Sequence, residues 1–316
     1  MKRFVGALQT TLASEIVLTG TGVHTGAPAS ITLSPTEAGT GIRFILPNGD
    51  DSIEIPASYR AISNVTLCTV LSDGNGGAVA TVEHLLAALR GLSVDNVLIE
   101  IDSGEVPIMD GSSKPFVDAI DEAGIEELDA ARRFIKVLKA VRVEDGQASG
   151  ELRPHNGFHV DVEIDFDSPL IGRQRIGLDV NPGSFREELS RARTFGFMKD
   201  VEGLWAAGLA LGASLENTVA IGEDRIINQE GLRYRDEFVR HKALDAIGDL
   251  ALAGAPILAA FQSSRGGHRL NSLVLKALFA DSDAWTYVDA PRGHREISHV
   301  ESGVAIAAAN YAADRS

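Results

Sequence analysis

His241 and Asp245 are spaced so that both side chains reach one point if the segment around them is helical. Residues four apart on an α-helix lie one turn above each other on the same face. An imidazole and a carboxylate that converge in this way are good ligands for a divalent metal ion. Asp249 continues the row by one more turn. The alternative is a local His–Asp pair on a solvated helix face, although the apolar neighbours Leu244 and Ile247 make such a face less natural.

A second acid–histidine pair, Glu83 and His84, stands near the start of another predicted helix. Adjacent helical residues point about 100° apart, so the two side chains suit different roles better than joint ligation. The imidazole favours metal binding, and the carboxylate favours a general base acting on a water. Three protein ligands would leave a fourth tetrahedral position open for that water, as in catalytic zinc sites. An acidic residue at a helix N-terminus beside a core histidine is the alternative.

His268 follows Gly266 and Gly267, between an apolar strand-like run and a predicted helix. Glycine-rich connections often present a side chain at a functional site. A histidine there can serve as a general acid if a carboxylate such as Asp249 keeps it protonated at neutral pH. A solvent-exposed histidine in a turn is the alternative. His24 lies in a similar glycine-rich segment, and its residue type alone assigns it no role.

The elements that must position these residues recur in the same order in two halves of the chain. In the first half, the β-prone runs cover residues 16–18, 29–33, 42–46 and 53–55. A predicted helix (81–90), a strand (97–101) and a second helix (115–123) follow them. In the second half the same order covers residues 134–143 and 158–166, then 238–253, 255–261 and 271–280. We therefore expect a tandem structural repeat, with a boundary in the charged stretch 126–133 and a separate tail over 291–316.

Composition excludes several classes of protein. The 316 residues are 44% hydrophobic and 23% charged, as in ordinary globular chains. The formal net charge of −15 argues against a nucleic-acid binder, which needs a basic face. The single cysteine, Cys68, permits no intramolecular disulfide and fits a reducing compartment. Because there is neither a signal-peptide pattern nor an apolar run of about 20 residues, we expect a cytoplasmic protein without an integral membrane segment.

Taken together, these motifs resemble one family, the UDP-3-O-acyl-N-acetylglucosamine deacetylases of lipid A and lipopolysaccharide biosynthesis in Gram-negative bacteria. The matching stretches are residues 22–26, 81–85, 106–112, 190–197, 240–250 and 267–268. They are collinear with the family and cover about residues 5–285. The resemblance implies hydrolysis of the N-acetyl group of UDP-3-O-(hydroxyacyl)-N-acetylglucosamine. The products would be acetate and the free 2-amino sugar nucleotide, in the committed step of lipid A biosynthesis.

The resemblance also implies roles for the site residues. It assigns one metal ion per chain, zinc or in the cell ferrous iron, to three ligands: His84, His241 and Asp245. It makes Glu83 the general base and His268 the general acid. Asp249 would orient His268, and Thr194 would donate a hydrogen bond to the oxyanion.

Substrate contacts follow from the same resemblance. Lys242 would contact the nucleotide diphosphate and Phe166 the uracil, while Cys68 would line the site. Further contacts are expected at Leu67, Phe195 and Phe197. The family holds its acyl chain in an apolar passage built by an insert, which here corresponds to residues 197–223. Ala213 stands where relatives often have glycine and would narrow this passage.

The fold implied is α+β. Two similar domains, residues 1–127 and 128–290, would each contain a β-sheet and two helices and form a β-α-α-β sandwich with the site at their interface. The enzyme is expected to be a monomer. One rival is a zinc amidohydrolase for an unacylated substrate, which needs no apolar insert. Another is a catalytically silent binding protein, which would be expected to lose Glu83 or His268 first.

Overall fold

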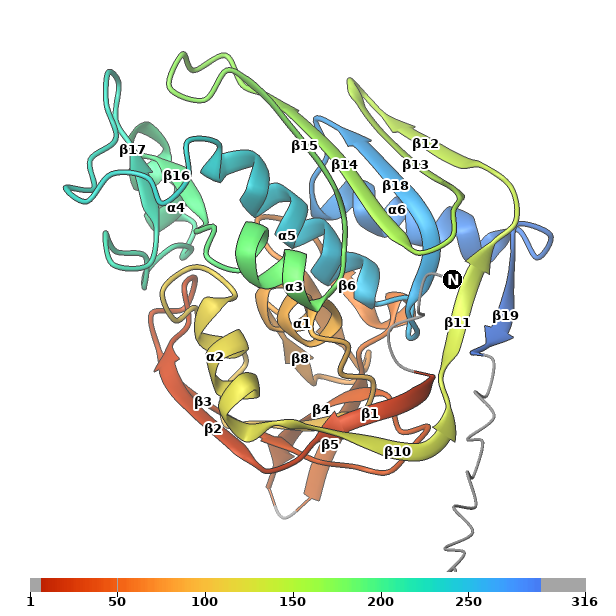
Figure 1. Ribbon diagram of the computed structural model, residues 1–316. Helices are drawn as coiled ribbons and strands as arrows, with labels where there is room; N and C mark the ends of the chain where they lie inside the picture. The colour runs from red at the N-terminus through yellow and green to blue at the C-terminus, as the bar shows by residue number, and fades with distance from the viewer. Residues whose placement is uncertain (1–6, 50, 291–316) are drawn as a thin grey trace, which may run out of the picture.

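The computed structural model describes residues 7–49 and 51–290; the tail predicted over 291–316 lies outside this part of the chain. Figure 1 shows two main β-sheets with helices between them. The first sheet belongs to the first half of the chain. Its strands, in spatial order, are β2 (Ile16–Thr21), β3 (Pro28–Ser34), β9 (Val97–Ile101), β4 (Ile42–Asn48) and β5 (Asp51–Pro56). The central pair β4–β9 is parallel, and the other pairs are antiparallel.

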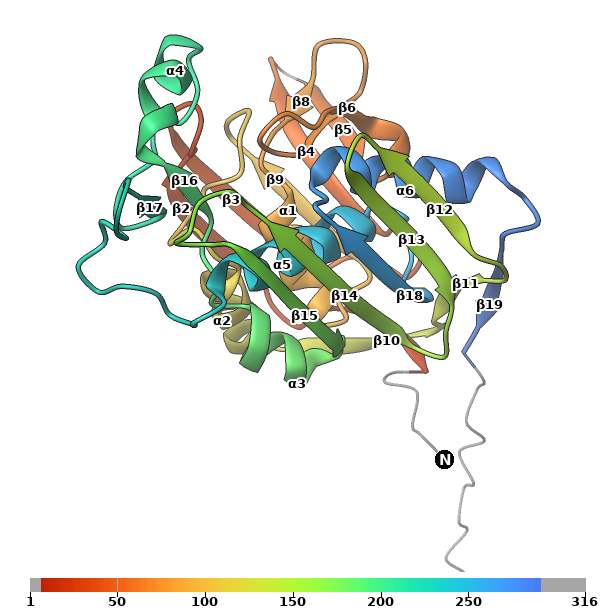
Figure 2. The same cartoon turned by 90° about the horizontal axis from the view of Figure 1, so that it is seen from above.

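The second sheet belongs to the second half, and Figure 2 looks down on it with the helices beneath. Its main path is β12 (Val141–Asp145), β13 (Ala148–Pro154), β18 (Ile257–Ser264), β11 (Arg133–Val137) and β19 (Trp285–Asp289). The strand β14 (Phe158–Asp165) pairs in parallel with β18 and antiparallel with β15 (Arg173–Asp179). Three small sheets complete the strands: β1 (Leu8–Leu12) with β10 (Ile125–Ala131), β6 (Ile62–Asn64) with β7 (Val70–Ser72) and β8 (Ala78–Val79), and β16 (Phe195–Phe197) with β17 (Val219–Ile221).

Four helices lie between the sheets: α1 (Glu83–Gly91), α2 (Lys114–Ala123), α5 (Glu237–Ala251) and α6 (His268–Ala280). Two short helices, α3 (Pro182–Ser184) and α4 (Val201–Ala206), belong to connections. The order of strands, helix, strand and helix is thus found in both halves. The mixed architecture confirms the predicted α+β class.

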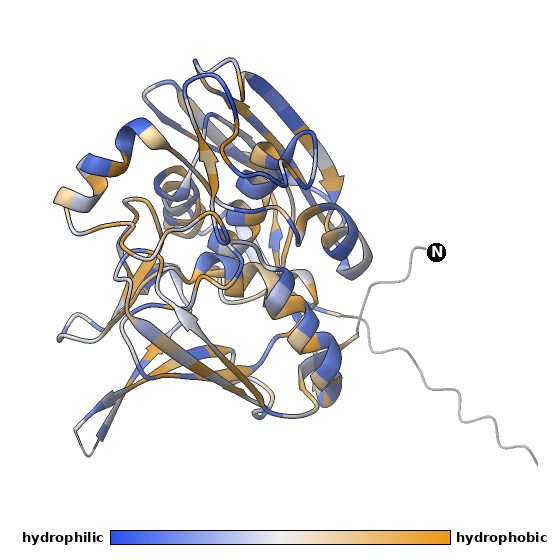
Figure 3. Ribbon diagram, turned by 90° about the vertical axis from the view of Figure 1, so that its left-hand side faces the viewer, coloured by the Kyte–Doolittle hydropathy of each residue, from blue (hydrophilic) through white to orange (hydrophobic). Residues whose placement is uncertain are grey.

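Hydrophobic patterning explains this arrangement. Along β3, Ala29, Ile31 and Leu33 are buried and their neighbours less so, which is the period-two pattern of a sheet with one face on the core. Figure 3 shows hydrophobic and hydrophilic positions alternating along strands of this kind. In α1 every residue except Arg90 is buried. A helix without a polar face must lie inside the protein, and α1 packs closely against α5 at the centre of the molecule.

Element boundaries differ from the predicted ones for identifiable reasons. The helix predicted from residue 81 begins at Glu83, because Thr81 has a φ of 58°, which a right-handed helix excludes. The helix predicted from residue 271 begins at His268, so this histidine occupies the first helical turn instead of the preceding loop. Most of the charged stretch 126–133, in which the boundary was predicted, forms β10, which pairs antiparallel with β1. The division of the chain into two domains at residues 127 and 128 remains a prediction.

Candidate metal centre and active site

The closest approach of α1 and α5 creates the site. At Gly248 in α5, a Cβ atom would lie 2.0 Å from the backbone oxygen of Glu83 at the start of α1. Only glycine permits this contact. The contact brings the first turn of α1, with Glu83 and His84, against the turn of α5 that carries Asp245 and Asp249.

The three predicted metal ligands converge at this contact. The Nε2 atoms of His84 and His241 lie 3.5 and 3.3 Å from Oδ1 of Asp245. One ligand atom from each residue lies within 4.8 Å of the other two. The imidazole rings stand nearly perpendicular, with their centroids 4.9 Å apart. All three side chains are buried, so one ion can be reached by all of them and be shielded from bulk water.

Hydrogen bonding leaves the inward-facing atoms available to a metal ion. His241 Nδ1 lies 3.1 Å from the carbonyl oxygen of Ala192, which holds the proton on Nδ1 and directs the Nε2 lone pair toward Asp245. Burial lowers the pKa of His241 to about 3, so the ring is neutral, as a ligand must be. Within residues 7–49 and 51–290, Oδ1 of Asp245 is buried without any hydrogen-bond partner. A buried carboxylate oxygen facing two imidazoles fits a divalent cation.

Lys242 supports the same carboxylate. Its Nζ donates a hydrogen bond to Oδ2 of Asp245 at 2.9 Å and lies 5.6 Å from the ring centre of Phe195. Burial by itself would raise the pKa of Asp245, but His241 and Lys242 outweigh it and hold the pKa well below its usual value. Asp245 is therefore ionised throughout the physiological range, with one oxygen bonded to Lys242 and the other open to the metal.

Glu83 is oriented by its surroundings. The backbone N–H of Thr69 donates to Oε2 of Glu83 at 3.1 Å, and Oε1 lies 3.7 Å from Nε2 of His268. Burial raises the pKa of Glu83 above its usual value, although the nearby His268 and His84 oppose the shift. A raised pKa makes this carboxylate a stronger base than an ordinary glutamate.

His268 faces Glu83 from the other side of the site. Its Nδ1 lies 2.9 Å from Oδ2 of Asp249. Burial would lower the pKa of His268, but the charges of Asp249 and Glu83 outweigh that effect and raise the pKa to about 9. Asp249 is itself fixed by the Thr69 hydroxyl at 2.6 Å and by the Asn271 amide at 2.8 Å. The imidazole is therefore protonated at neutral pH and held in one orientation, as a proton donor requires.

A cavity of about 430 Å³ opens from these residues. Its wall includes Glu83, His84, Asp245 and His268 at one end, and the insert residues Met198, Val201, Leu204, Trp205 and Leu215 along its length. Figure 2 shows that the segment with β16 and α4 stands to one side of the main sheets. The cavity thus joins a polar end to an apolar passage, within the size range of small-molecule sites.

The insert is fastened to the first half of the chain at the turn around His24. The backbone N–H groups of Leu211 and Gly212 donate to the carbonyl oxygens of His24 and Val23, at 3.1 and 3.0 Å. The turn itself is held by buried Glu105, which accepts hydrogen bonds from the His24 and Thr25 backbone at 2.9 Å each. His24, to which its residue type gave no role, therefore lines the cavity and anchors its wall.

The predicted substrate contacts divide into two groups. Four of them line the cavity, namely Phe195, Phe197, Leu67 and Lys242, and Thr194, the predicted oxyanion donor, lines it too. Cys68 is buried, and burial together with the charge of Glu83 raises the pKa of its thiol to about 12. Phe166 packs on the rings of Phe195 and Phe197, with centroids 5.8 and 6.1 Å away. Cys68 and Phe166 are not among the wall residues, so any contact that they make with a ligand requires some rearrangement. Asp249, which was predicted to orient His268, is not a wall residue either.

Sequence reasoning missed Thr69 and Glu105. Both residues act through hydrogen bonds to partners more than ten positions away. Thr69 directly follows Leu67 and Cys68, which were predicted to lie at the site. The available signal for Glu105 was its position directly before the matching stretch 106–112.

Comparison with known proteins agrees with this geometry. The family model for UDP-3-O-acyl N-acetylglycosamine deacetylases matches residues 9–280. The chain belongs to this family. UDP-3-O-acyl-N-acetylglucosamine deacetylases of Brucella ovis, Brucella canis and Brucella melitensis are each 53% identical to it over 287 residues, which is 90% of this chain and 100% of theirs.

Membership in the deacetylase family confirms the predicted class of enzyme, a metal-dependent hydrolase. The matched range includes all the residues of the candidate site, from His24 to His268. None of the helices within residues 7–49 and 51–290 has the length and apolar character needed to cross a bilayer.

Proposed function

We propose that this member of the deacetylase family hydrolyses the N-acetyl group of UDP-3-O-(hydroxyacyl)-N-acetylglucosamine, releasing acetate and the 2-amino sugar nucleotide. This is the committed step of lipid A biosynthesis in this family. The observation that carries the proposal is the cavity itself. One end holds the acid–base residues and the His84–His241–Asp245 cluster, and the other is an apolar passage that suits an acyl chain.

We infer that the metal is zinc, with ferrous iron as the alternative, held by His84, His241 and Asp245. Two imidazoles and one carboxylate are a ligand set of catalytic zinc sites, which keep a further position open. When bound, such an ion lowers the pKa of a water and polarises the carbonyl to be attacked. The orphaned Oδ1 atom of Asp245 and the fixed tautomer of His241 support this assignment.

The protein residues then divide the proton transfers. Glu83, with its raised pKa, takes the proton of the attacking water. Thr194 on the cavity wall donates a hydrogen bond to the oxyanion of the tetrahedral intermediate. His268, kept protonated by Asp249, gives a proton to the leaving amine. An amide is cleaved only if its nitrogen leaves protonated, so the high pKa of His268 is the property that this step requires.

Substrate binding is assigned to the remaining wall residues. We assign Lys242 to the diphosphate, since it is a cation on the cavity wall beside Asp245. Phe195, Phe197 and Leu67 present apolar surface, and Phe166 would reach the uracil only through the aromatic cluster that it forms with the two other phenylalanines. Cys68, which is buried and outside the cavity wall, would contact substrate only after a rearrangement. We also propose that the enzyme acts as a monomer in the cytoplasm.

The experiment that tests this function follows acetate release from the acylated UDP-sugar by purified protein. Glu83→Gln keeps the size and the hydrogen bond from Thr69 but removes the base. We expect it to reduce kcat by about 10²–10⁴-fold while metal content stays at the wild-type level. Near-normal turnover by Glu83→Gln would contradict the assignment of the base. Equal turnover of substrate with and without the acyl chain would favour the rival amidohydrolase for an unacylated substrate.

A further inference from the structure

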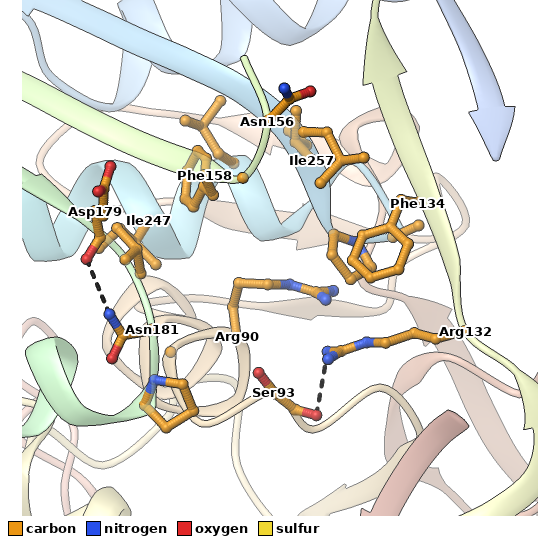
Figure 4. Close-up of a pocket in the computed structure, with 18 residues that line it drawn as sticks. Arg90, Ser93, Arg132, Phe134, Asn156, Phe158, Asp179, Asn181, Ile247 and Ile257 are labelled. Atoms are coloured by element: carbon orange, nitrogen blue, oxygen red, sulfur yellow. Dashed lines mark hydrogen bonds between the residues drawn. The ribbon is translucent and has the colours of Figure 1, made fainter. Parts of the chain in front are cut away.

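A second, larger cavity lies away from the proposed active site. It has a volume of about 600 Å³, and Figure 4 shows its wall. The end of α1, the start of β14, the C-terminal part of α5 and the start of β18 all contribute, so the cavity lies where the two halves of the chain meet. Among residues 7–49 and 51–290, no residue belongs to the walls of both this cavity and the active-site cavity. Its volume is in the range of sites that bind small organic molecules.

Arg90, the last basic residue of α1, extends into this cavity (Figure 4). Its side chain is only 9% exposed. Within the described residues, 7–49 and 51–290, its Nε and Nη1 atoms are buried and have no hydrogen-bond partner. Burial, with the nearby Arg132, lowers the pKa of Arg90 to about 10, so the guanidinium still carries its charge at neutral pH. A buried charged donor without an acceptor is costly unless a ligand supplies one.

The neighbouring carboxylate is already engaged. Asp95 accepts hydrogen bonds from Nε and Nη2 of Arg132 at 3.1 and 2.9 Å and from the Thr10 backbone at 3.2 Å. Nη1 of Arg90 comes only within 3.5 Å of it, too poorly placed for a hydrogen bond. Two guanidinium groups therefore share one carboxylate. The two N–H groups of Arg90 that lack an acceptor are therefore not satisfied by this carboxylate.

Asp179, the acidic residue of the described wall, is not an acceptor for these two N–H groups. Its carboxylate lies 2.8 Å from His159 and is 69% exposed, so it faces water beside another partner. The rest of the wall is largely apolar, including Phe158, Ile247, Leu250 and Ile257. A ligand that fits must therefore combine an anionic head with an apolar body.

We propose that this cavity binds an amphipathic anion, with a carboxylate or phosphate on Arg90 and an alkyl or aryl body against the apolar residues from α5 and β18. Guanidinium groups bind both oxyanions well because they present several N–H donors in one plane. The proposal is independent of the deacetylase function, since it uses different residues and a different cavity.

The test is a titration of metal-loaded full-length protein, labelled at isoleucine methyl groups, with decanoate, decyl phosphate and decanol. Ile247 and Ile257 line the second cavity, and Ile108 lines the active-site cavity, so methyl shifts distinguish the two places of binding. We expect saturable shifts of Ile247 and Ile257 with decanoate or decyl phosphate. The tighter of the two ligands identifies the preferred head group, and decanol should bind about tenfold more weakly or worse.

Arg90→Met removes the charge and retains the length of the side chain. Because Asp95 keeps its bonds to Arg132, the ion pair beneath the cavity survives the change. We expect this variant to bind the anions about tenfold more weakly or worse, while Arg90→Lys keeps part of the affinity. Shifts confined to Ile108, or equal binding of decanol and the anions by the wild type, would overturn the proposal, and the second result does not depend on any variant folding.

Discussion

Replacing Gly248 by alanine tests whether the approach of α1 to α5 builds the metal centre. The new Cβ would lie 2.0 Å from the Glu83 oxygen, 2.8 Å from its carbonyl carbon and 3.1 Å from its Cα. Ordinary contact begins at 3.4 Å, so the two helices must separate locally by about 1.4 Å, the difference between 3.4 and 2.0 Å. The new Cβ is fixed to the α5 backbone and meets backbone atoms of Glu83 in α1, so no side-chain rotation can relieve the clash.

This separation acts directly on the ligands. His84 belongs to α1 and Asp245 to α5, and their ligand atoms are now 3.5 Å apart. Metal–ligand distances tolerate changes of about 0.2 Å, so His84 would lose its place in the site. A displacement of about 1 Å at reacting groups costs about 10²-fold in rate. Overpacking lowers the free energy of unfolding by about 1–3 kcal/mol. The higher helix propensity of alanine offsets up to about 1 kcal/mol of that loss.

The assay compares Gly248→Ala with the matched control Gly203→Ala, a helical position in α4 where a Cβ would meet nothing within 4 Å. Acetate release, metal content after dialysis and urea unfolding are measured for both variants. We expect the control to match the wild type. Gly248→Ala should lose metal and about 10²-fold in kcat while remaining folded. If its kcat and metal content stay within about threefold of the wild type, the helix contact does not position the ligands as argued.

Three further results are expected. Asp249→Asn removes the carboxylate that keeps the pKa of His268 near 9, so the imidazole should lose its proton at lower pH. The alkaline limb of the kcat/KM profile should then move to lower pH. A limb that does not move would belong to the titration of another group. The Cys68 thiol has a pKa of about 12, so iodoacetamide at pH 8 should alkylate it slowly in the native protein and rapidly in urea; equal rates would show that the thiol is accessible. Ala213→Gly removes a methyl group from the passage wall. We expect the ratio of kcat/KM for longer acyl chains to that for shorter ones to rise by up to about tenfold. An unchanged ratio would argue against a constriction at this residue.

Local spacing was sufficient to predict part of the site. The four-residue interval between His241 and Asp245 requires only that α5 be a helix, and α5 is one. Likewise β9 has the predicted bounds, since its five apolar-rich residues are flanked by clear turn signals. The predicted ligand set from α1 and α5 came from resemblance and not from spacing, because no periodicity relates two helices separated by about 150 residues.

Contacts over long sequence distances were beyond such reasoning. The role of Gly248 depends on the backbone of Glu83, and that of Thr69 on two carboxylates from different helices. The start of α1 depends on the left-handed backbone of Thr81, whose hydroxyl bonds to Glu105. Tertiary packing decides each of these features, and the residue types concerned are compatible with many other conformations.

The attachment of the insert to the turn around His24 bears on how acyl-chain preference can evolve. Backbone groups make both hydrogen bonds, so exchanging the side chains at Val23 or Leu211 leaves the donors and acceptors in place. The lining of the passage can therefore drift toward other chain lengths without opening its wall. Gly212 is the exception, because a Cβ there would lie 2.2 Å from the Gly22 oxygen. Substitutions that change the acyl-chain preference are therefore tolerated more readily during evolution than a substitution of Gly212.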